Sequence, residues 1–415
     1  MKATNETRMF WKLSLAAVVL ICFDTAIAQT SYKVTDLGAL NDGVWGCAMG
    51  LNNHGWTESM DGYLDGSGNF RGRAVVNIPG LKIDLGTLGG PDSWINWGGI
   101  NERGEAVGFA ETSVLDPNGE DVCTFGTKLT CRPFLWENGD ITALPTLGGN
   151  NGQASAINNR GQIVGQAETT ASDSGCPPYR ITFPVLWEKG RVQQLPTVDG
   201  DPDGFVNGIN DVGQAVGATG TCYGPNHAVR WENGTAVELP DLGNASFNAA
   251  FAINTQGQIV GLSSSPDGTT FYAALWQNGA ITNLGTLPGD FSAFATGINN
   301  RGQVVGTTLD ANFNYLHGFI WENGVMTDLN TLFPADSNLY ATMANKINSR
   351  GQISGMATVL SGPDAGNIHA FLATPVHASI ASSVAAIAAT HSTSAMPANV
   401  RKQLLRGLGL GRFVR

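Results

Sequence analysis

The sequence contains few charged residues. Only 14% of its 415 residues are Asp, Glu, Lys or Arg, whereas 54 are glycine. Long solvent-exposed helices depend on Lys, Glu and other straight-chain residues, and glycine weakens them. The composition therefore excludes a mainly helical protein and favours short strands joined by tight turns.

The sequence also lacks the common catalytic motifs. It has no Gly-x-Ser-x-Gly elbow, His-Glu-x-x-His helix, phosphate-binding loop or Cys-x-x-Cys pair. A pair of carboxylates contributed by distant parts of the chain would leave no such motif. Catalysis thus stays open, although the sequence favours a non-catalytic protein.

Long apolar runs are missing outside the N-terminus. Basic residues precede the apolar segment Leu13–Cys22, and Ala26 and Ala28 supply small residues two positions apart. This order predicts a signal peptide over 1–28, cleaved near Ala28, with an uncleaved anchor as the alternative. No later run approaches the roughly 20 residues that span a bilayer. We expect an extracellular or periplasmic protein without a transmembrane span in the mature chain.

The charge is distributed unevenly. The formal net charge is −11, yet residues 376–415 contain five basic residues and no acidic one, so the acidic excess lies in residues 29–375, which carry a formal charge of −17. An acidic body repels phosphate, which excludes nucleic acid as a partner. We expect the Ala-rich and basic tail over 376–415 to be flexible.

Two short phrases alternate along residues 29–375. The first is an Ile-Asn-turn-Gly-Gln-x-Val-Gly pattern, as in AINNRGQIVG over 156–165. Its asparagine recurs at steps of 44 to 57 residues, at Asn52, Asn101, Asn158, Asn210, Asn254, Asn299 and Asn348. We expect this asparagine to cap its turn through its own backbone.

The second phrase is an apolar run ending in Trp, followed by a turn. PFLWENGDITALP over 133–145 is typical, and Asn-Gly between alternating apolar residues is a strong hairpin signal. Its tryptophans should pack between neighbouring repeats: Trp136, Trp187, Trp231, Trp276 and Trp321.

Two hairpins in each repeat predict an all-β fold, a seven-bladed β-propeller of four-stranded antiparallel blades. The last repeat stops after its third strand near residue 375, while residues 32–40 resemble a lone fourth strand. We therefore expect the N-terminal strand to close the last blade and leave no open edge.

Residues 32–375 resemble the HAF-repeat proteins, a bacterial group of probable extracellular repeat proteins. The family's trio stands intact at His369-Ala370-Phe371, and variants of it begin at His227 and His317. The resemblance implies export and a repeat fold, and it brings no established activity. Equivalent histidines of different blades lie around a ring, so they should not share a metal ion.

Loop lengths indicate which propeller face binds ligands. The turns after strands one and three are short, whereas the loops after strand two vary, covering 109–131 and 166–182 in two repeats. Variable loops on a rigid scaffold commonly carry binding sites. The aromatic residues at the entrances to the blades are candidates for ligand contact, with packing between blades as the alternative: Trp94, Trp97, Phe205, Phe247 and Phe291.

One acidic loop resembles a calcium-binding loop. Asp199, Asp201 and Asp203 alternate before a glycine, and Asn207 follows at the ninth position. The twelfth position holds Asn210 in place of the bidentate glutamate, so a full EF-hand is excluded. Calcium and a simple acidic turn are both compatible with this pattern, and residues 116–121 form a weaker candidate of the same kind.

Five cysteines remain after cleavage of the signal peptide. In an oxidising compartment Cys123 can pair with Cys131 and Cys176 with Cys222, which would fasten the two longest loops. Cys47 is left as a buried free thiol.

Taken together, these features predict a secreted, monomeric binding module for a carbohydrate or protein ligand. Two alternatives remain: an extracellular enzyme acting on polysaccharide, with carboxylates on the loop face, and a structural protein of the envelope or matrix.

Overall fold

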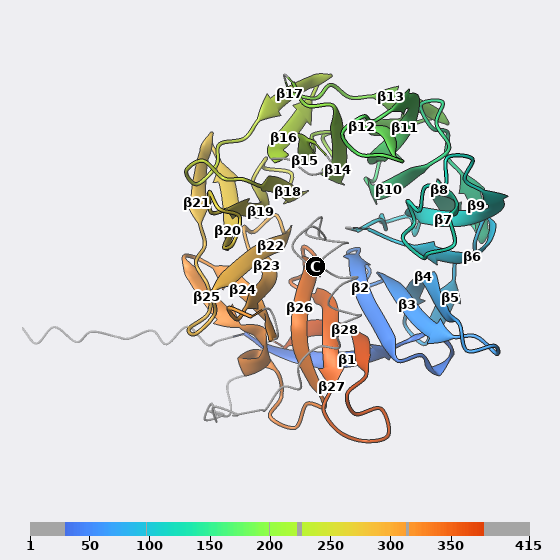
Figure 1. Cartoon of the computed structure of the whole chain (residues 1–415). Coiled ribbons are helices and arrows are strands. Elements are labelled where there is room, and N and C mark those ends of the chain that lie inside the picture. The colour runs from blue at the N-terminus through green and yellow to red at the C-terminus, as the bar shows by residue number, and fades with distance from the viewer. Residues whose placement is uncertain (1–29, 97, 199, 222–225, 313–314, 377–415) are drawn as a thin grey trace, which may run out of the picture.

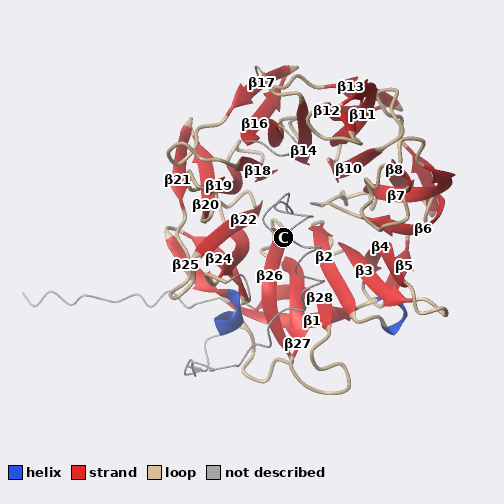
Figure 2. Cartoon of the chain, in the orientation of Figure 1, coloured by secondary structure: helices blue, strands red, loops and turns tan. Residues whose placement is uncertain are grey.

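The computed structural model describes residues 30–96, 98–198, 200–221, 226–312 and 315–376. The predicted signal peptide, the C-terminal tail, Trp97, Asp199 and Cys222 lie outside these described residues. In Figures 1 and 2 the described chain forms a ring of small sheets, and the chain runs once around it.

Each blade is four antiparallel strands, which follow chain order in the first six blades. Blade one consists of β2 (Trp45–Leu51), β3 (Thr57–Leu64), β4 (Phe70–Ile78) and β5 (Leu81–Asp84). Blade two consists of β6 (Gly89–Trp94), β7 (Ala106–Leu115), β8 (Leu129–Glu137) and β9 (Asp140–Ala143). Blade three consists of β10 (Gly152–Ile157), β11 (Ile163–Ser172), β12 (Arg180–Glu188) and β13 (Arg191–Gln194).

The next three blades repeat this plan. Blade four consists of β14 (Asp203–Ile209), β15 (Ala215–Gly220), β16 (Asn226–Glu232) and β17 (Thr235–Glu238). Blade five consists of β18 (Asn248–Ile253), β19 (Ile259–Ser264), β20 (Phe271–Gln277) and β21 (Ala280–Asn283). Blade six consists of β22 (Ser292–Ile298), β23 (Val304–Leu309), β24 (Leu316–Glu322) and β25 (Val325–Asp328). Short 3-10 turns cover Leu40–Asp42 and Leu329–Leu332.

The seventh blade is completed by the N-terminus, as the sequence predicts. Strands β26 (Leu339–Ile347), β27 (Ile353–Val359) and β28 (Ile368–Val376) come from the end of the described chain, and β1 (Ser31–Gly38) pairs antiparallel with β28. Buried Tyr32 of β1 packs into the core of this blade. One bridge between Trp45 and Ile368 also joins the seventh blade to the first.

The turns adopt the backbone conformations that their residues favour. Asn138 and Gly139, between β8 and β9, have φ values of 54° and 92°, as a two-residue hairpin turn of this hand requires. The same pair of positive φ values recurs in the corresponding turns of blades three to six. The Asn-Gly hairpin prediction is confirmed.

The tryptophans of the third strands pack between blades, as expected. Trp187, Trp231 and Trp276 are almost fully buried, and each Nε1 donates a hydrogen bond of 2.6 to 2.7 Å to a proline carbonyl of the preceding blade. These bonds fasten strand three of one blade to the end of its neighbour.

One expectation about the loops needs correction. Residues assigned to long loops extend strands β7, β8, β11 and β12, so the loop between β7 and β8 covers only 116–128 and that between β11 and β12 only 173–179. The backbone groups of these segments pair with each other, which satisfies their hydrogen bonds more fully than an open loop would.

Candidate functional site

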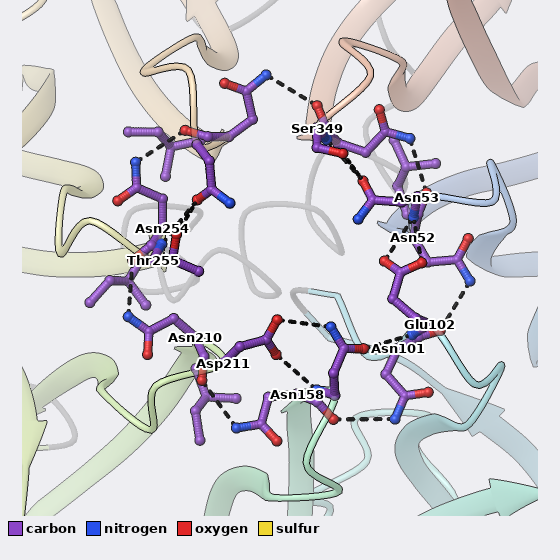
Figure 3. A pocket seen from close by; sticks show the side chains of 18 of the residues that line it. Asn52, Asn53, Asn101, Glu102, Asn158, Asn210, Asp211, Asn254, Thr255 and Ser349 are labelled. Atoms are coloured by element: carbon purple, nitrogen blue, oxygen red, sulfur yellow. Dashed lines mark hydrogen bonds between the residues drawn. The ribbon is translucent and has the colours of Figure 1, made fainter.

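The turns after strand one of every blade meet around the central channel. The repeated asparagine stands at each turn, and Figure 3 shows these residues arranged in a circle. Each Asn Oδ1 caps its own turn; that of Asn158, for example, accepts the N–H groups of Arg160 and Gln162 at 3.0 Å. The capping function expected from the sequence is confirmed.

The same asparagines also join the blades. Each Nδ2 donates to the backbone carbonyl of the repeated asparagine in the next blade, and all seven bonds measure 2.9 to 3.2 Å. The last bond runs from Asn348 to Asn52 and closes the circle between the seventh and first blades. We call this closed set of seven residues the asparagine ring.

A second set of hydrogen bonds joins neighbouring blades at the residue that follows each repeated asparagine. Backbone N–H groups of Asn53, Glu102, Asn159, Thr255 and Ser349 donate to the side chain at the corresponding position of the next blade. Polar groups at this mouth thus largely satisfy one another, and we assign the mouth mainly a structural role.

The opposite face, formed by the loops after strands two and four, contains a larger cavity of about 960 Å³. We call it the loop-face cavity. It lies where blades seven, one and two meet, and it is lined by residues 44–45, 64, 68–71, 92, 124–127 and 366–368. Three loops that differ in length and sequence therefore form its walls.

Aromatic rings form much of this lining. Trp45 and Phe125 line the cavity, and Trp94 stacks on Trp45 with ring centroids 5.2 Å apart and also meets Phe125 edge-on. Phe70 is 38% exposed at the rim, beside the still more exposed Leu64. The Nε1 of Trp45 is buried and has no hydrogen-bond partner among the described residues.

Two charged groups face one another across this lining. Arg71 forms an ion pair of 2.7 Å with Asp65 and lies 3.7 Å from Asp92. Burial raises the pKa of Asp92, while its bond from the Gly72 N–H and the nearby arginines oppose that change. Asp92 is the only acidic residue among the described residues that line the cavity.

A second carboxyl group lies behind the wall. Glu111 is fully buried and accepts a hydrogen bond from Thr127. Burial, with the nearby Asp92 carboxylate, raises the pKa of Glu111 to about 7. Because no part of Glu111 is exposed, it does not form an accessible acid–base pair with Asp92.

The aromatic candidates from the sequence are scattered. Trp94 lies beside the loop-face cavity, packed between blades one and two, and Trp97 is outside the described residues. Phe247 is 1% exposed within the core and cannot meet a ligand in this structure. Phe205 is partly buried against the same core, whereas Phe291 is 48% exposed on a separate blade.

The acidic loop of the calcium hypothesis does not gather its described members. Asp201 pairs with His227 at 2.8 Å and accepts a bond from Thr219. Asp203 accepts the Thr182 N–H of blade three, and Asn207 donates to Ala250 of blade five. Asp199 lies outside the described residues, and in the described part no group of three Asp, Glu, His or Cys could hold a metal ion.

The structure confirms the disulfide between Cys123 and Cys131. Cys47 is a buried free thiol, as expected, and burial raises its pKa to about 12. Cys176 is disulfide-bonded. Its pairing with Cys222 stays a prediction, because Cys222 is outside the described residues.

Each of the three repeat histidines pairs with its own aspartate. His227, His317 and His369 contact Asp201, Asp290 and Asp36 at 2.8 to 3.0 Å. The last of these pairs joins β28 to β1 within the closing blade. The three histidines belong to three different blades.

Comparisons with known proteins found similarity among solved structures. No protein-family model and no curated protein sequence matches the chain. Among solved structures, the β-propeller domain of the Trilobed protease from Pyrococcus furiosus is similar, with TM-score 0.46 and 8% identity, covering 80% of this chain and 95% of that one.

Two peptidases are similar over part of their length. A prolyl endopeptidase matches with TM-score 0.48 and 9% identity, covering 84% of this chain, and an acylaminoacyl peptidase with TM-score 0.44 and 9% identity, covering 77%. The chain spans 51% and 49% of those two chains. At this identity the likeness concerns the fold alone. The chain's own strand topology defines it as a seven-bladed β-propeller. Among the described residues no helix has the length and apolar character needed to cross a membrane.

Proposed function

We propose that this propeller is a secreted, non-catalytic module of the HAF-repeat type that binds carbohydrate in the loop-face cavity. The observation that carries the proposal is the lining itself: aromatic rings beside a few polar side chains, in a cavity of about 960 Å³. Aromatic faces stack against the C–H faces of sugar rings, while amide and carboxylate groups bind hydroxyls.

The polar groups are suitably placed for this purpose. Asn69, Asn367, Arg71 and Asp92 line the same space as Phe70 and Phe125. The Nε1 of Trp45 is itself buried, so hydrogen bonds to sugar hydroxyls would come from the polar side chains at the cavity surface.

Binding is favoured over cleavage. Glycoside hydrolysis generally uses two carboxyl groups on either side of the scissile bond. Asp92 is the single acid in the described lining and is only 2% exposed, and Glu111 is fully buried behind it. A polysaccharide-cleaving enzyme is therefore the second candidate, resting on this neighbouring pair.

The test is a screen of the full mature chain against a polysaccharide and glycan panel, with calcium and with chelator. We expect retention without release of reducing ends. Release of reducing ends that is lost in Asp92→Asn would select the enzyme. Absence of both retention and release across the panel would overturn a carbohydrate ligand.

A further inference from the structure

The central channel contains one residue that breaks the repeat. Two positions before each repeated asparagine, six blades carry glycine or alanine: Gly50, Gly99, Ala156, Gly208, Ala252 and Gly297. The seventh blade has Lys346 at this position. A Cβ on Gly99 would lie 2.5 Å from the Val107 carbonyl oxygen, so the small residues follow from crowding of the strands.

Lys346 extends across this crowded space. Its Nζ donates a long bond of 3.4 Å to the Thr296 carbonyl of blade six. On the other side, a Cβ at Gly98 of blade two would lie 3.2 Å from the same Nζ. The ammonium group therefore lies in the channel, between blades six and two.

The surroundings of Lys346 are largely apolar. It lines a cavity of about 210 Å³ in the central channel, next to the asparagine ring. Seven residues that precede the asparagines form an apolar collar between that ring and this cavity: Leu51, Ile100, Ile157, Ile209, Ile253, Ile298 and Ile347. Among the described residues that line this cavity, Asn207 is the only one besides Lys346 with a polar side chain.

No acidic group in the described part of the chain compensates this charge by an ion pair with Lys346. Burial alone lowers the pKa of Lys346 to about 8, which leaves the amine largely protonated at pH 7. The buried Glu58 accepts the Gly99 N–H at 2.9 Å, and burial raises its pKa to about 8, so it is mostly neutral there. At the mouth, Glu102 and Asp211 accept bonds from Asn53 and Asn159.

We propose that the central channel binds a small organic monocarboxylate, with its carboxylate paired to Lys346 and its apolar body against the isoleucine collar. One buried cation matches one negative charge, whereas a dianion such as phosphate would leave charge uncompensated in apolar surroundings. The ligand would enter past the asparagine ring. This site is distinct from the loop-face cavity and does not depend on the carbohydrate proposal.

The test uses thermal unfolding of the full mature chain with butyrate and with butyramide, its neutral counterpart, at constant ionic strength. Variants are Lys346→Met and the control Lys33→Met, which removes an exposed lysine of β1. We expect millimolar butyrate to raise the midpoint of wild type and Lys33→Met by about 2 °C and to leave Lys346→Met unchanged. Butyramide and phosphate should have no comparable effect.

Equal shifts in wild type and Lys346→Met, equal shifts with butyramide, or no shift with butyrate would each overturn the proposal. A second measurement needs no variant: a crystal of the wild type soaked in 3-bromopropionate. Anomalous bromine density in the channel beside Nζ would support the site, and its absence there would contradict it.

Discussion

The two faces of the propeller differ in how uniform their residues are from blade to blade. On the face of the strand-one turns, the same asparagine makes the same bonds in all seven blades. On the loop face, the segments after strand two differ in length and sequence, and three of them surround the loop-face cavity. Contacts that recur in every blade stabilise the blades, whereas residues found at a single junction between blades are available to bind a ligand.

This contrast also identifies the exception on the uniform face. Lys346 occupies a position where the other blades have only glycine or alanine. An uncompensated cation in an apolar channel lowers stability, so its presence needs a reason other than folding.

The largest effect should come from breaking the asparagine ring. Asn299→Ala removes bonds to the Asn348 carbonyl and Gln303 and leaves the Arg301 and Gln303 N–H groups without their acceptor. We expect a loss of about 3 kcal/mol in the free energy of unfolding, measured with denaturant. Asn312→Ala, at an exposed asparagine, is the matched control and should cost less than about 0.5 kcal/mol. Equal effects of the two changes would remove the structural role assigned to the ring.

A smaller loss should follow from opening the disulfide on the loop face. Replacing Cys123 and Cys131 together by serine frees a short loop that contains cavity residues 124–127. We expect about 2 kcal/mol of destabilisation by chemical denaturation and weaker glycan retention. Unchanged retention would indicate that this loop does not shape the binding site.

The pH dependence of the free energy of unfolding should report the protonation of the Lys346 amine. The pKa of the Lys346 amine is lowered to about 8 in the folded protein from its ordinary value of 10.5. Between pH 8 and pH 10.5 the unfolded chain therefore binds more protons at this amine than the folded protein does. Stability from this group therefore increases as pH rises from 8 towards 10.5. Lys346→Met should be more stable than wild type at pH 7, with the difference shrinking above pH 8 in denaturant titrations. A less stable variant at pH 7 would show that Lys346 supports the fold.

The smallest change in stability should come from the cavity rim. Phe70 is partly exposed, so Phe70→Ala should alter the free energy of unfolding by less than about 1 kcal/mol. A loss of several kcal/mol, measured by the same denaturant titration, would place Phe70 among structural residues instead.

Much of the fold was predictable because it depends on local patterns. The Asn-Gly turns, the spacing of Trp187 and Trp231, and the complementary ends of the chain predict seven blades closed by β1. The disulfide between Cys123 and Cys131 was predictable because both belong to one repeat segment.

The asparagine ring and the loop-face cavity depend on contacts between blades. Nothing in the local sequence indicates that the Asn52 Nδ2 reaches the carbonyl of Asn101, or that Phe70 and Phe125 share one cavity. Phe247 resembled a candidate because of its position at the entrance to a blade, but packing between blades buries it. One signal was available: the lysine in KIN at 346–348, where the other six repeats begin the same tripeptide with glycine or alanine.

The central claim is that the loop-face cavity binds the ligand. Its most direct test is calorimetric titration of the glycan retained in the screen into wild type, Phe70→Ala and Phe291→Ala, which removes a similarly exposed ring on another blade. We expect Phe70→Ala to weaken binding about fivefold or more, since aromatic contacts of this kind contribute on the order of 1 kcal/mol or more. Phe291→Ala should bind as wild type does. Equal affinities for all three proteins, or a loss confined to Phe291→Ala, would contradict the assignment of the site.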